Sequence, residues 1–170
     1  PMHTLELSDN KLSFHSIRLL AETLNIRREV FRANLQVLLL GSNTLTDDAI
    51  PHICSILETQ DLTDLNLVGR KVHISLIGDF SCIGTAGNSD NSDDGDGDGY
   101  ADLVHIPPRI THYGIFRLSS ALETHHTLVT LSLTSQSAGD RGAESLASAL
   151  CSNAVLTSLQ LGDNQITSDG

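Results

Sequence analysis

The feature that most constrains the fold of this chain is a recurring pattern of leucines. Three leucines recur 28 residues later in the chain: Leu128, Leu131 and Leu133 are followed by Leu156, Leu159 and Leu161. An internal period of this length indicates a repeat architecture, in which each repeat buries its apolar face only against its neighbours. The chain is therefore expected to form a stack of similar units and not a globule around one central core.

The same pattern, LxxLxLxxN, occurs three more times upstream. These copies contain Met2, Leu5, Leu7 and Asn10; Leu35, Leu38, Leu40 and Asn43; and Leu62, Leu65, Leu67 and Arg70. The alternation within LxL predicts a short strand whose leucines face one side. The tract GAESLASAL between two copies carries apolar residues at helical spacing. One strand and one helix per repeat predict an α/β fold with parallel strands.

A polar position closes each strand copy. It holds Asn10, Asn43, Arg70, Gln136 and Asn164. An amide there can bond backbone groups of neighbouring turns, whereas an arginine would be awkward if the turn is buried. The first repeat is longer than the others, since Met2 and Leu35 are farther apart than Leu35 and Leu62, and its extra tract NIRREVFRAN is expected to extend the helix or the loop.

The leucine period and the tract GAESLASAL resemble the ribonuclease-inhibitor class of leucine-rich repeats. This class is also found in NOD-like receptors and in activators of the Ran GTPase. The resemblance covers nearly all of the chain outside residues 72–109. It implies a curved leucine-rich-repeat solenoid, with the parallel strands on the concave side and the helices outside. For function it is less specific, because one architecture hosts many partners.

One repeat is interrupted by an insertion. Leu62 and Leu128 are more than twice as far apart as the equivalent leucines Leu128 and Leu156, and joining Lys71 directly to Ile110 restores a nearly regular repeat. The chain is thus divided into leucine-rich repeats over 1–71, an insertion over 72–109 and further repeats over 110–170. The insertion is expected to form a loop or a β-hairpin between the strand and the helix of its repeat, at the surface.

The centre of the insertion, NSDNSDDGDGDGYAD, alternates aspartate with glycine. Such a loop converges carboxylate oxygens on a hard cation, and the predicted calcium ligands are Asp94, Asp96, Asp98, the Tyr100 carbonyl and Asp102. The segment DGDGYADL resembles the core of an FG-GAP repeat of the integrin-α type, which also implies calcium. Three alternatives stay open: a disordered Asp/Gly tract, an unremoved intron carried into the sequence, and a partner-binding loop.

Composition narrows the class of function. The formal charge is −11, with 21 acidic and 10 basic residues, which argues against nucleic-acid binding. No GxSxG or GxxxxGK[ST] motif occurs, and His125 and His126 are adjacent in a turn and share no helix face, so neither catalysis nor zinc binding is expected. Apolar runs are too short to span a membrane. Cys54 and Cys151 are expected to be buried free thiols, which favours a cytoplasmic location.

The positions between the strand leucines form the predicted partner surface, on the concave face. The candidate contact residues are Glu6, Gln36, Val37, Leu39, Asp64, Asn66, Thr130, Ser132, Ser158 and Gln160. They are mostly small and polar, and Leu39 is the first choice for a partner contact. The alternative is that these residues only keep the sheet soluble.

The favoured function is a protein-interaction scaffold, not an enzyme, that binds an unidentified protein partner. One alternative is a calcium-tuned scaffold, in which the acidic insertion orders on binding metal. The other is a GTPase-activating module, which the resemblance to Ran activators implies and for which Arg70 and Arg141 are the arginines near repeat turns.

Overall fold

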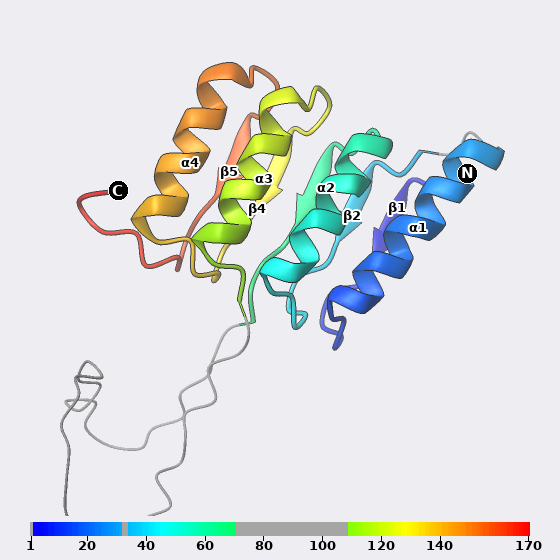
Figure 1. Ribbon diagram of the computed structural model, residues 1–170, viewed down its shortest axis with the longest axis horizontal. Helices are drawn as coiled ribbons and strands as arrows, with labels where there is room; N and C mark the ends of the chain where they lie inside the picture. The colour runs from blue at the N-terminus through cyan, green and yellow to red at the C-terminus, as the bar shows by residue number, and fades with distance from the viewer. Residues whose placement is uncertain (1, 32–33, 71–108) are drawn as a thin grey trace, which may run out of the picture. The chain divides into compact units, whose positions relative to one another are not determined.

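The computed structural model describes residues 2–31, 34–70 and 109–170, except for the side chain of Phe31. In these ranges the fold is α/β, with five parallel strands in the order β1-β2-β3-β4-β5 (Figure 1). The strands are β1 (Thr4–Glu6), β2 (Val37–Leu39), β3 (Asp64–Asn66), β4 (Thr130–Ser132) and β5 (Ser158–Gln160). The helices are α1 (Phe14–Phe31), α2 (Ile50–Thr59), α3 (His112–Thr124) and α4 (Gly139–Ser152), with a short 3-10 helix, η1 (Asp47–Ala49), before α2.

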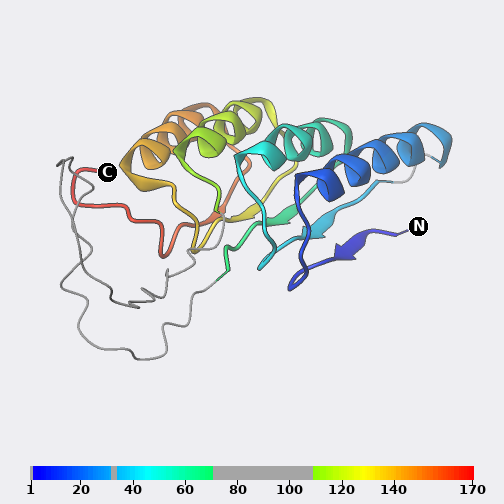
Figure 2. The same cartoon turned by 60° about the horizontal axis from the view of Figure 1, so that its bottom comes forward.

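Strands and helices alternate along the chain, so each of the first four strands and the helix after it form one unit. The four helices lie side by side on one face of the sheet (Figure 2), and each packs against the next. The prediction of one parallel strand and one helix per repeat is confirmed. The extra residues of the first repeat lengthen its helix, since α1 continues to Phe31.

The core lies between the sheet and the helices. Register pairs Leu38 with Leu65 and Leu65 with Leu131, so that one repeat position forms a row across the sheet. All three leucines are at most 1 % exposed, and Ile53 and Leu118 from the helices cover them at 0 %. Burial of each such side chain contributes about 1.5–3 kcal/mol. Leu5 and Leu159, in the outermost strands, are only partly buried.

A side-chain amide stands in the turn after four of the five strands, and two of these amides show the same bonds. The Asn43 amide donates to Leu7 O at 2.9 Å and to Leu40 O at 2.8 Å, and its Oδ1 accepts from Leu12 N. Asn164 repeats this arrangement on Leu133 O and Leu161 O. The prediction that this position bonds neighbouring turns is confirmed. We call the three buried amides of Asn43, Gln136 and Asn164 the amide ladder.

The turn after β3 differs from the others. The residue before the polar position is left-handed in four units, at Asp9, Ser42, Ser135 and Asp163 (φ 56–63°). Gly69, at the same position, is not left-handed, and Arg70 is exposed. Arg70 therefore avoids the burial that would be awkward for an arginine, because this turn has another geometry. Leu67 O still accepts from the amide of the following unit, through Gln136 at 2.6 Å, as Leu7 O accepts from Asn43.

Helix α4 is less buried than its sequence suggested. Leu146 and Ala149 face the core, but Leu150 is 38 % exposed and Cys151 is exposed. The expectation of a buried Cys151 thiol is wrong, because α4 is covered by a neighbouring helix, α3, on one side only. Cys54 is half-buried against α3, and burial raises the pKa of its thiol to about 11.

The insertion falls outside the described residues, apart from Arg109. The described units belong to one compact body built from Pro1–Lys71 and Pro107–Gly170. Within the described ranges, no helix combines the length and the apolar character needed to cross a membrane.

Candidate functional site

The face of the sheet that points away from the helices carries most of the predicted contact residues. Because the strand leucines point into the core, their neighbours point outward. The register aligns these neighbours into two rows: Thr4, Val37, Asp64, Thr130 and Ser158; and Glu6, Leu39, Asn66, Ser132 and Gln160. We call these ten positions the sheet face. Gln36, just before β2, is exposed beside it.

An apolar pair lies at one end of the sheet face. Val37 and Leu39 are neighbours on the outward side of β2, and both are half-buried. Leu39 is paired with Glu6 on β1, and Val37 is paired with Asp64 on β3. The structure thus places two aliphatic side chains between two carboxylates, on adjacent strands about 4.8 Å apart.

The charge of the sheet face is negative. Neither row contains a lysine or an arginine, whereas Glu6 and Asp64 are acidic. Hydrogen bonds from Ser8, through its side chain and then its backbone N–H, lower the pKa of Glu6. Asp64 accepts a bond from the Thr63 hydroxyl at 2.8 Å. Carboxylate oxygens accept charge-assisted hydrogen bonds, so both side chains can receive a cationic group from a partner.

The other end of the sheet face is more closed. Ser132 is only 5 % exposed and donates to Gln160 Oε1 at 2.9 Å, so the expectation that Ser132 is open to a partner is wrong. Asn66 Oδ1 accepts from Val68 N, so this amide is also engaged within the chain. Thr130 and Ser158 are half-buried and Gln160 is exposed. Ser132, Gln160 and Asn66 thus have hydrogen-bond partners within the chain, and the apolar side chains of the sheet face are Val37 and Leu39 on β2.

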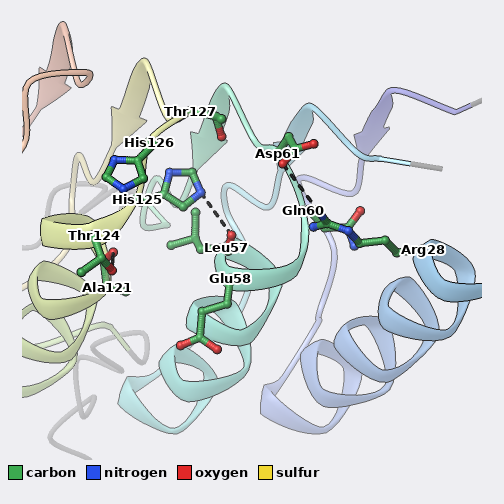
Figure 3. Close-up of a pocket in the computed structure, with 10 residues that line it drawn as sticks. All are labelled: Arg28, Leu57, Glu58, Gln60, Asp61, Ala121, Thr124, His125, His126 and Thr127. Atoms are coloured by element: carbon green, nitrogen blue, oxygen red, sulfur yellow. Dashed lines mark hydrogen bonds and ion pairs between the residues drawn. The ribbon is translucent and has the colours of Figure 1, made fainter. Parts of the chain in front are cut away.

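A second feature is a hollow of about 330 Å³ between the C-terminal ends of α2 and α3 (Figure 3). Its titratable and charged groups are Arg28, Glu58, Asp61, His125 and His126. Arg28 and Asp61 form an ion pair at 3.9 Å, and both side chains are about half exposed, so the pair adds at most about 1 kcal/mol.

No single chemistry dominates this hollow. Cationic and anionic groups are mixed in it, and His125 is engaged with backbone groups of both neighbouring segments. Across the described part of the chain, no three His, Cys, Asp or Glu side chains are close enough to hold a metal ion.

Some sequence predictions concern residues that the structure does not describe or does not test. The calcium ligands Asp94, Asp96, Asp98, Tyr100 and Asp102 lie outside the described residues, so calcium binding stays a prediction. Arg70 and Arg141 are both exposed, in the turn after β3 and in α4. Their surroundings select no role in GTPase activation, which also stays a prediction.

The helix layer holds a surface feature that the sequence did not reveal. Tyr113 and Phe116 on α3 are 67 % and 62 % exposed, and Leu19, Ile26 and Val30 on α1 are at least 57 % exposed. In the sequence of α1, apolar residues occupy both faces of the helix, so the pattern does not distinguish the buried face from the exposed one. Only the packed structure separates the inner face from the outer one.

Comparisons with known proteins assign no family to the chain. No protein-family model matches it, and no curated protein matches its sequence. The site is therefore interpreted from its own residues.

Proposed function

We propose that this chain is a protein-interaction scaffold of the leucine-rich-repeat type, whose sheet face forms the concave, partner-binding side of a curved solenoid. Support comes from the regular alternation of strand and helix, from the residue rows that the register creates, and from the amide at the end of the strand in four of the five units. Stacking identical units is the way in which such repeats build an extended binding surface.

The observation that carries the proposal is the apolar pair between two carboxylates. Val37 and Leu39 offer an aliphatic contact, and Glu6 and Asp64 lie in the neighbouring strands with no basic residue in either row. The matching partner presents an apolar side chain flanked by lysine or arginine. The apolar contact supplies affinity, while the charges guide encounter and orientation.

A cytoplasmic location is part of the same proposal. Cys54 and Cys151 are free thiols. Free thiols persist in a reducing compartment, and half-burial of Cys54 with its raised pKa makes that thiol poorly reactive.

Peptide selection followed by calorimetry tests the proposed surface. Peptides are selected from a random library on the full chain, and their affinities are measured for the unaltered chain and for Leu39→Asp. The matched control is Leu19→Asp, which places the same charge on the outward side of α1, where Leu19 is 57 % exposed. We expect Leu39→Asp to weaken binding at least about tenfold, equal to about 1.4 kcal/mol, and the control to leave it unchanged.

Charge is tested separately with Glu6→Gln combined with Asp64→Asn. We expect the selected peptides to be basic and to bind this double variant more weakly, with a smaller dependence on salt. Circular dichroism establishes that each variant is folded. Peptides that bind Leu39→Asp as tightly as the unaltered chain would place binding elsewhere and overturn the proposal.

A further inference from the structure

The ends of successive helices carry one recurring device, in which a side chain joins two backbone segments. Asn153, just after α4, accepts from Leu156 N at 2.8 Å and donates to Leu122 O at 2.7 Å. Asn153 therefore joins the segment that leads into β5 to the end of helix α3. This bridge uses one acceptor and one donor, which a neutral amide supplies at any pH.

His125 occupies the same place in the unit that precedes that of Asn153. Its Nδ1 accepts from Leu128 N at 3.1 Å, and its Nε2 lies 3.1 Å from Leu57 O (Figure 3). Leu128 and Leu57 correspond to Leu156 and Leu122, so the imidazole makes the same bridge as the amide. The α2 helix, the end of α3 and the segment that enters β4 all meet at this ring.

The two bonds fix the protonation state of the ring. A backbone N–H can only donate, so Nδ1 must keep its lone pair to bind Leu128 N. A carbonyl can only accept, so Nε2 must carry the hydrogen that faces Leu57 O. The ring is thus the neutral Nε2–H tautomer. An imidazolium ion has two donors and no acceptor, and it cannot hold the Leu128 bond.

The surroundings of the ring disfavour its protonated form. Partial burial lowers the pKa of His125, and the neighbouring His126 lowers it further. The backbone carbonyls of Leu57 and Gln60 and the charge of Asp61 act in the opposite direction but more weakly than burial.

The remaining neighbours are also accounted for. Glu58 and Arg28 line the same hollow, and Arg28 is paired with Asp61. From the α4 side the facing group is the Asn153 amide, which donates to His125 O at 3.2 Å and carries no charge.

We propose that His125 is an acid-sensitive latch, whose protonation releases Leu128 N and opens the junction between α2, α3 and the segment leading into β4. In the following unit, Asn153 makes the same joint insensitive to pH. In the described part of the chain, the joint at His125 is thus titratable, and the corresponding joint at Asn153 is not. Leu128 lies two residues before Thr130, the first residue of β4. Opening therefore begins next to the start of a strand that contributes to the sheet face.

The direction of the pH effect follows from linkage. The folded state binds the proton on His125 more weakly than the unfolded chain, whose histidine pKa is about 6.5. The latch contributes its full stability above that value and loses it as the pH falls from there through the lower pKa of the folded state. Acidification therefore favours opening, by up to about tenfold in the equilibrium constant per pH unit within this window.

Hydrogen exchange on the full chain tests the latch. The opening equilibrium of the Leu128 amide is measured between pH 7.5 and 5, after correction for the intrinsic exchange rate, for the unaltered chain, for His125→Asn and for the control His126→Asn. We expect opening to increase on acidification in the unaltered chain and in the control. In His125→Asn, which copies Asn153, the dependence should become flat at this amide.

A second measurement needs no variant. Nitrogen chemical shifts of the imidazole identify the tautomer, and we expect His125 to be the Nε2–H form with a pKa below the ordinary histidine value of about 6.5. A Leu128 amide that opens equally with pH in the unaltered chain and in His125→Asn would overturn the proposal, as would an Nδ1–H tautomer. Neither readout depends on partner binding, so the latch is tested independently of the proposed function.

Discussion

Asn43 shows how much of a turn a single amide can hold. It is only 5 % exposed, and it bonds two carbonyls and one N–H from two different units. Gln136 makes the equivalent bonds with a side chain one methylene longer, to Leu67 O and Ile110 N. A buried amide with all its partners adds to stability, while loss of the amide leaves each partner desolvated and unpaired.

We predict that Asn43→Ala lowers the free energy of unfolding by about 2–4 kcal/mol, because each orphaned backbone group costs about 1–3 kcal/mol. The control is Asn10→Ala. Asn10 has the same repeat position but is exposed and bonds only carbonyls of its own turn. Its loss should cost less than about 1 kcal/mol. Urea unfolding measures both, and equal losses would mean that burial of the amide is not what matters.

Gly69 is a position where the backbone of one unit closely approaches that of the next. A Cβ there would lie 1.8 Å from Ser135 O, which no small adjustment removes. We predict that Gly69→Ala destabilises the chain by at least about 2 kcal/mol. Gly162→Ala is the control, since the nearest atom to its Cβ is Thr134 Cγ2 at 3.6 Å. Thermal unfolding distinguishes the two, and a Gly69→Ala chain as stable as the control would contradict the close approach.

At the residue scale, the sequence predicted the strand leucines and the amide position. It could not predict that Arg70 is exposed or that Ser132 is closed by Gln160. Both outcomes depend on the neighbouring unit, and a pattern within one repeat carries no information on contacts between repeats.

At the scale of elements, carboxylates at the starts of two helices bond to the following unit. Asp47 in η1 accepts from Thr111 N at 2.7 Å and from Thr111 Oγ1 at 2.6 Å. Asp140 in α4 makes the same pair of bonds to Thr167. Aspartates near helix starts are commonly caps of their own helix, but η1 has no side-chain cap bond. Here the carboxylate serves the next unit, on the far side of the insertion in the sequence.

We predict that Asp47→Ala lowers the free energy of unfolding by about 1.5–3 kcal/mol, as is typical for bonds to a charged acceptor. Asp48→Ala is the matched control, because Asp48 is the neighbour of Asp47 in η1. Its loss should stay within about 0.5 kcal/mol. Urea unfolding of the two variants gives the comparison, and a control as damaging as Asp47→Ala would attribute the effect to net charge.

At the scale of the whole molecule, one repeat is interrupted between Lys71 and Ile110, and deletion of the insertion tests whether the repeats need it. Ile110 is fully buried and its N–H binds Gln136, so a deletion must keep Ile110 and Thr111. We predict that a chain in which Lys71 is joined directly to Ile110 unfolds at a midpoint within a few degrees of the unaltered chain, because loops at this position tolerate changes in length. Circular dichroism on heating measures the midpoint.

The same two chains test the predicted calcium ligands. We expect calorimetry to show saturable calcium binding by the full chain and none by the shortened one, with stabilisation that grows as RT ln(1+[Ca]/Kd). Binding by both chains would assign the metal to the repeats. The absence of binding by either would remove calcium from the function.

The sequence predicted the order of elements over the described ranges because the leucine period fixes which residues pair in the sheet. Burial does not follow from the period alone. Leu5 and Leu131 have equal positions in the pattern, yet Leu131 is fully buried and Leu5 is partly exposed. The difference reflects the number of neighbours, which a repeat motif does not encode.

The amide ladder also has a direction. Asn43, Gln136 and Asn164 each donate to a carbonyl of the unit that precedes them in the chain. During synthesis on the ribosome, these carbonyls, of Leu7, Leu67 and Leu133, therefore receive their amide donors only after the following unit has emerged from the exit tunnel. A pause in translation between two such units would leave the earlier carbonyl without its amide donor until synthesis resumes.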